Sequence, residues 1–84
     1  MGYYIVMPTA EAAAEWGEFF AAPSTGLTAN GHHAHVEGGR LVFSAGAIDF
    51  MRGWGPEDDG VVTEEAGQLT MWLAGHPYEV HRES

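Results

Sequence analysis

The hydrophobic positions between residues 9 and 22 recur with a helical period, at about 100° per residue. This segment has one apolar side and one acidic side. Thr9 can cap the first turn, and Pro23 ends the pattern. We therefore predict an amphipathic helix whose apolar side packs on the rest of the chain. The apolar side consists of Ala12, Ala13, Trp16, Phe19 and Phe20, and the acidic side of Glu11, Glu15 and Glu18.

The segments flanking this helix have the patterns of strands. Residues 3–7 (YYIVM) form a continuous apolar run, which is typical of a central or doubly covered strand. Residues 32–45 read as a hairpin around Gly38 and Gly39, a dipeptide typical of primed two-residue turns. Pairing outward from this turn places Ala34, Val36, Leu41 and Phe43 on one face, which we expect to be the core face. His33, His35, Glu37, Arg40, Val42 and Ser44 then share the outer face.

The second half of the chain predicts a short helical turn, a loop and a three-stranded meander. Residues 47–54 fit the helical turn, and residues 55–60 (GPEDDG) read as a loop. The meander strands are expected at 61–63, 69–73 and 78–81. Its turns are expected at 66–67 and 74–77, with Leu73 facing Tyr78, Met71 facing Val80 and Trp72 on the outer face. Residues 81–84 are expected to fray.

These elements predict the α+β class. We expect a mainly antiparallel sheet of about five to six short strands with the amphipathic helix packed on one face. The predicted order is β-α-β-β-(short α)-β-β-β. At 84 residues, the chain is expected to form a single small domain, residues 1–84.

The charge balance narrows the classes of partner. Twelve acidic residues face three Arg and no Lys, which gives a formal net charge of −9. Direct nucleic-acid binding requires a basic surface, so this class is disfavoured, as is adsorption to an anionic membrane. A protein partner with a basic surface fits the long-range field of this chain.

Several other classes lack sequence support. The chain has no Cys, no basic segment followed by an apolar run at its start, and no apolar stretch of about 20 residues. A cytoplasmic location is therefore the expectation. No nucleophile occurs in a recognisable catalytic context, so an enzyme is not expected and no cofactor is predicted. Residues 57–60 lack the spacing of a calcium-binding loop.

Histidines form the one candidate metal site. His33 and His35 would lie on the same face of a strand, with Glu37 next along that face as a third ligand. A small metal- or ligand-binding domain using His33 and His35 is therefore one alternative. A homo-oligomeric structural or accessory protein is another, since Trp54 and Trp72 are candidate interface aromatics.

The favoured interpretation rests on the acidic side of the predicted helix. Carboxylates one turn apart, about 5.4 Å, repeat at a spacing near that of backbone phosphates. Because ordinary surface helices interleave Lys with Glu, the absence of Lys favours a specific role. We predict a non-enzymatic inhibitor that occupies a basic nucleic-acid-binding surface, in the manner of anti-CRISPR and other DNA-mimic proteins of phages. The candidate partner-binding residues are Glu11, Glu15, Glu18, Glu57, Asp58, Asp59, Glu64 and Glu65.

Overall fold

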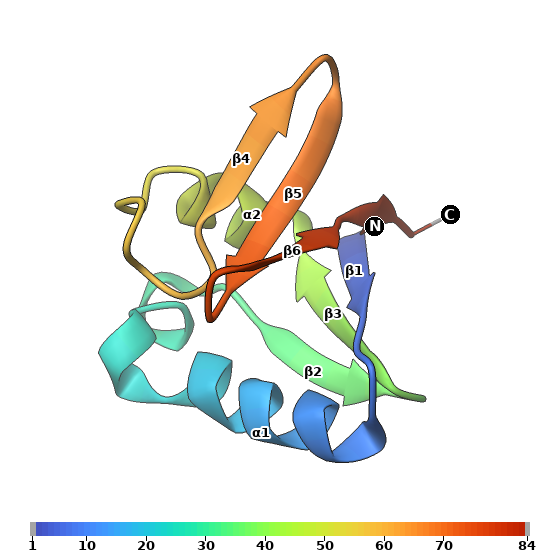
Figure 1. Cartoon of the computed structure of the whole chain (residues 1–84). Helices are drawn as coiled ribbons and strands as arrows, with labels where there is room; N and C mark the ends of the chain where they lie inside the picture. The colour runs from blue at the N-terminus through green and yellow to red at the C-terminus, as the bar shows by residue number, and fades with distance from the viewer. Residues whose placement is uncertain (1, 84) are drawn as a thin grey trace.

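The computed structural model describes residues 2–83 and confirms the α+β class. Figure 1 shows a long helix beneath a sheet, with a second sheet above it. The helices are α1 (Ala10–Ala21) and α2 (Ala45–Met51), and two 3-10 turns are η1 (Pro23–Thr25) and η2 (Thr28–Asn30). The strands are β1 (Gly2–Val6), β2 (Ala34–Glu37), β3 (Arg40–Ser44), β4 (Val62–Glu65), β5 (Gln68–Leu73), β6 (His76–Glu79) and β7 (His81–Arg82).

The strands form two antiparallel sheets rather than one. The first has the order β2-β3-β1-β7 and the second the order β4-β5-β6. The predicted first hairpin is confirmed residue by residue, because Glu37 pairs with Arg40 and Ala34 with Phe43. The apolar run of β1 lies at the centre of its sheet, between β3 and β7.

Helix α1 begins at the predicted cap and packs on the first sheet against β2 and β3. Thr9 Oγ1 accepts a hydrogen bond from the Ala12 N–H at 3.0 Å, which satisfies one of the free donors of the first turn. Gly17 lies where the helix approaches the sheet. A β-carbon there would lie 2.7 Å from Val36 Cγ2, so glycine permits the close approach.

We expect Thr9→Ala to lower the free energy of unfolding by about 1 kcal/mol, because the Ala12 N–H loses its acceptor. Thr9→Ser keeps the hydroxyl and is the matched control. Urea denaturation of the three proteins measures the difference. A Thr9→Ala midpoint equal to that of Thr9→Ser would contradict a stabilising cap.

One hydrophobic core joins both sheets and both helices. Phe20 from α1 contacts Phe43 from β3, with ring centroids 5.1 Å apart and an interplanar angle of 84°. Ile48 and Met51 bring α2 into the same core, and Met71 and Leu73 bring in β5. The short helix was predicted at 47–54 and is observed at Ala45–Met51. Leu27, between the two 3-10 turns, is fully buried in it.

The meander departs from its predicted register. Met71 pairs with Tyr78 and Leu73 with His76, a shift of two residues that leaves the same side chains facing the core. The shift arises because Ala74 and Gly75 alone form the turn, with φ values of 51° and 78°. The prediction included Pro77 in the turn, but Pro77 lies in β6, which is an edge strand, where a proline is tolerated.

Three further expectations were wrong. Residues 81–83 do not fray: β7 pairs with β1, and the Glu83 N–H donates to the Gly2 carbonyl at 2.8 Å. Val36 lies on the predicted core face, against Gly17 of α1, but it is 44% exposed rather than buried, because β2 is an edge strand. Val42 is only 5% exposed on the predicted outer face, because the register places it between His35 and Tyr4, whose side chains flank it.

Candidate functional site

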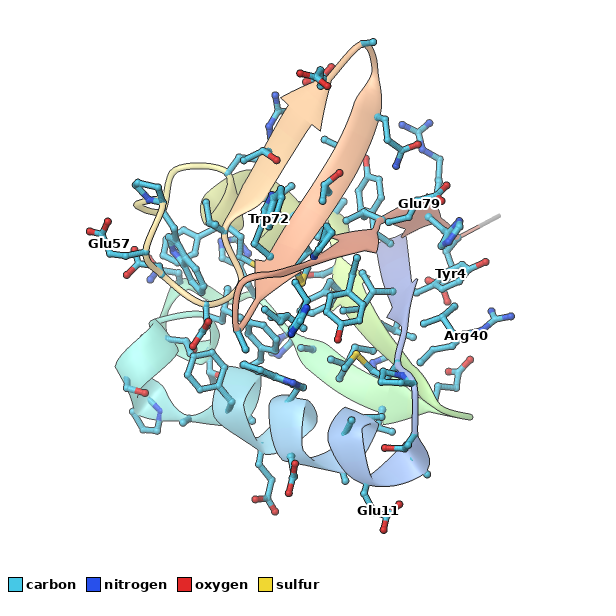
Figure 2. The ribbon with its side chains drawn as sticks, in the orientation of Figure 1. Tyr4, Glu11, Arg40, Glu57, Trp72 and Glu79 are labelled. Atoms are coloured by element: carbon cyan, nitrogen blue, oxygen red, sulfur yellow. The ribbon has the colours of Figure 1, made fainter. Side chains whose placement is uncertain are left out.

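The three glutamates of α1 are exposed along the side of the helix that faces away from the sheet. Figure 2 shows Glu11 pointing into solvent below the helix. Within residues 2–83, no hydrogen bond or ion pair joins Glu11, Glu15 or Glu18 to another side chain. The last turn of α1 contains no basic residue. This side of the helix therefore carries three uncompensated negative charges.

The arginines lie elsewhere. The Arg40 guanidinium carbon lies 4.3 Å from the centre of the Tyr4 ring, and that of Arg82 lies 5.7 Å from the centre of the Tyr3 ring. Both contacts belong to the first sheet; Arg40 and Tyr4 are labelled together in Figure 2. Arg52 pairs with a glutamate of β4. The cationic side chains therefore do not neutralise the acidic side of α1.

The acidic loop, residues 55–60, holds two of its carboxylates by backbone hydrogen bonds. Asp58 Oδ2 accepts from the Gly55 N–H at 2.8 Å, and Asp59 Oδ1 accepts from the Ala74 N–H at 2.9 Å. Glu57 is exposed and points outward from the loop in Figure 2, on a different side of the molecule from Glu11. The helix and loop acids therefore do not form one continuous patch.

The third acidic group lies apart from both. Arg52 Nη2 donates to Glu64 Oε1 at 2.7 Å, so this carboxylate has a cationic partner. Glu64 and Glu65 belong to the β4–β5 hairpin, which projects away from α1 in Figure 1. The eight predicted residues therefore fall into three groups, and only the helix and loop groups contain no side chain paired with an Arg in the described structure.

A cavity of about 370 Å³ lies between the C-terminal end of α1 and the acidic loop. Sequence reasoning did not find this cavity, because its walls come from three separate segments. The sequence pattern placed Phe19 in the core and gave no role to Ser24 or Thr25. The lining residues are Phe19, Ser24, Thr25, Trp54, Asp58 and Asp59. The linings of two other cavities include no acidic side chain among the described residues.

The two candidate interface tryptophans have different environments. Trp54 is half-buried and packs against the core beside Phe50, with ring centroids 6.1 Å apart. Trp72 is 37% exposed on the outer face of the second sheet, as predicted, and its indole Nε1 donates to Thr63 Oγ1 at 3.0 Å. Trp72 therefore offers a fixed apolar surface, while Trp54 forms part of the cavity wall.

The histidines do not converge on a ligand set. His33 and His35 are both exposed, and His35 Nε2 lies 3.3 Å from Glu37 Oε2. Among residues 2–83, no group of three or more His, Cys, Asp or Glu side chains is placed to hold a metal ion. Within residues 2–83, the histidines therefore form no preformed metal site. The candidate site is the acidic side of α1 together with the adjoining cavity.

Neither helix in the described range has the length and apolar composition needed to cross a bilayer. Comparison with known proteins found no matching family model, no similar curated protein and no similar solved structure.

Proposed function

We propose that this protein is a non-enzymatic binding domain that uses the acidic side of α1 to occupy a basic surface on a partner protein. The single observation that supports this most strongly is the set of three exposed helix carboxylates without a cationic partner in the described structure. The basic surface is one that otherwise holds nucleic acid.

The electrostatics of the helix support the proposal. Glu11 and Glu15 are four residues apart, and Glu15 and Glu18 are three apart, so each pair is repulsive by about 0.2–0.5 kcal/mol. Glu18 also lies near the negative end of the helix dipole. Glu11 lies in the first turn, where a negative charge is favourable, but the two repulsive pairs and the position of Glu18 oppose helix stability. A cationic partner surface would reverse the sign of this contribution on binding.

The spacing supports a surface made for phosphates. Successive carboxylates on α1 are separated by about one helical turn, roughly 5.4 Å along the axis. A Lys- and Arg-lined channel that follows a nucleic-acid strand would meet these carboxylates in sequence. The finer form of the proposal is a cytoplasmic inhibitor of a host defence or nucleic-acid-processing complex, comparable to DNA-mimic proteins of phages.

The test uses the triple variant Glu11→Gln, Glu15→Gln, Glu18→Gln. We expect it to capture its partner from host lysate with affinity lower by on the order of tenfold at low salt, since each exposed charge pair contributes about 0.2–1 kcal/mol. Folding stability should change little, because removal of the two repulsive pairs offsets loss of the favourable Glu11 charge in the first turn. Quantitative pull-down with thermal unfolding of the same samples measures both.

The matched control is Glu37→Gln, Asp49→Asn, Glu79→Gln, which changes the net charge equally at three exposed positions outside the predicted set. This control should retain partner capture. Added duplex DNA or RNA should release the partner from the wild-type protein. Equal loss of capture by both variants would indicate a net-charge effect and would contradict a role for the α1 side.

A further inference from the structure

We propose that the cavity between α1 and the acidic loop receives an arginine side chain of the partner protein. The inference rests on the proposed function and assigns it an anchor point. The cavity combines aromatic walls with two carboxylates, Asp58 and Asp59, and neither carboxylate forms an ion pair within the described chain. This combination matches an arginine, whose apolar stem and cationic end require both kinds of surface.

The aromatic walls are held in place by their neighbours. Phe19 packs edge-to-face against Trp16, with ring centroids 5.4 Å apart, and against Phe20, with centroids 5.1 Å apart. Trp54 packs edge-to-face against Phe50. These contacts fix the ring orientations before a ligand arrives. A preorganised wall reduces the entropy lost when a side chain binds.

The two carboxylates are held in place by backbone hydrogen bonds. One oxygen of Asp58 accepts from the Gly55 N–H, and one oxygen of Asp59 accepts from the Ala74 N–H. The loop itself is tied to β5, because the Gly60 N–H donates to the Trp72 carbonyl at 2.7 Å. Each carboxylate keeps a second oxygen for which the described chain provides no donor. These oxygens can accept hydrogen bonds from an incoming cation.

Arginine fits this cavity better than lysine. A guanidinium is planar, stacks on aromatic faces and presents five donors, whereas an ammonium is compact and strongly hydrated. A cation over a tryptophan face gains further attraction from the ring quadrupole. The cavity supplies the Trp54 ring as an aromatic wall and two adjacent carboxylates for the donors.

The test follows the indole N–H signals of the three tryptophans by NMR, since Trp54 lines the cavity and Trp16 and Trp72 do not. The probe is the blocked peptide acetyl-Gly-Arg-Gly-amide. It should shift the Trp54 indole and the Asp58 and Asp59 amides saturably. The citrulline peptide, which has nearly the same shape without the charge, should leave them unchanged, and the lysine peptide should bind more weakly.

Asp58→Asn and Asp59→Asn keep an acceptor for the N–H groups of Gly55 and Ala74, so the loop should remain folded. Each should weaken binding of the arginine peptide by up to about fivefold, the range of an exposed ion pair. Glu11→Gln is the matched control and should have no effect. The inference is overturned if the citrulline peptide binds equally, if Trp72 or Trp16 shifts instead of Trp54, or if both Asn variants bind as wild type does.

The two proposals fail separately. If the α1 triple variant loses partner capture but the arginine peptide leaves Trp54 unchanged, the role of the α1 glutamates is supported and the arginine site in the cavity is contradicted. If the peptide binds at Trp54 while the triple variant captures its partner fully, the arginine site in the cavity is supported and the role of the α1 glutamates is contradicted.

Discussion

Phe20→Ala is expected to lower the free energy of unfolding by about 3–5 kcal/mol, the largest effect of any single truncation considered for this chain. Phe20 is 1% exposed and joins α1 to the first sheet through its contact with Phe43. It also packs against Phe19, a wall of the cavity. A domain of this length has a total stability of roughly 4–12 kcal/mol, so the variant should be partly unfolded at 37 °C.

Urea denaturation followed by tryptophan fluorescence measures this loss. Phe20→Leu is the control, because it keeps an apolar side chain of similar reach and leaves a smaller cavity. We expect the leucine variant to lose less than half as much stability as the alanine variant. An alanine variant within about 1 kcal/mol of wild type would contradict the central place of Phe20 in the core.

Gly60→Ala is expected to cost about 2–4 kcal/mol, because it combines a strained backbone with overpacking. The φ of Gly60 is 104°, a conformation that L side chains rarely adopt. A β-carbon there would lie 2.7 Å from Phe20 Cε1 and 2.9 Å from Trp54 Cζ3. Accommodating it requires both rings to move.

Gly67→Ala separates the two causes. Gly67 has a φ of 83°, and a β-carbon there would meet no atom within 4 Å. This variant should therefore show the backbone cost alone, roughly 1–2 kcal/mol. Denaturation of both variants gives, as the difference, the packing cost at Gly60 together with the added backbone cost of its larger φ. Equal losses at the two positions would contradict the close packing of Phe20 and Trp54 around residue 60.

The predictable parts of the fold are those fixed by local sequence. The periodicity of residues 9–22 and the cap at Thr9 determine α1, and Gly38 with Gly39 determines the first hairpin and its register. The β5–β6 register was missed because Pro77 was assigned to the turn, whereas it pairs with Trp72 in the edge strand β6. Strand β7 was missed because two residues carry no pattern, and only their pairing with β1 orders them.

The candidate site also has a part that local sequence predicts and a part that depends on tertiary contacts. Exposure of Glu11, Glu15 and Glu18 follows from helical geometry alone, so the sequence predicts it correctly. The cavity depends on contacts between residues far apart in sequence, such as the hydrogen bond between Asp59 and Ala74. The pairing of Glu64 with Arg52 is likewise a tertiary contact. Sequence reasoning therefore found the charges but not their grouping.

The salt dependence of binding tests most directly whether the acidic side of α1 meets a cationic surface. Affinities of the purified partner for the wild-type protein and for the Glu11, Glu15, Glu18 triple glutamine variant are measured over a salt series. We predict that the wild-type affinity falls steeply with salt, whereas the variant is weaker at low salt and less sensitive, so that the two curves converge. Coincident curves over the whole series would contradict such a contact.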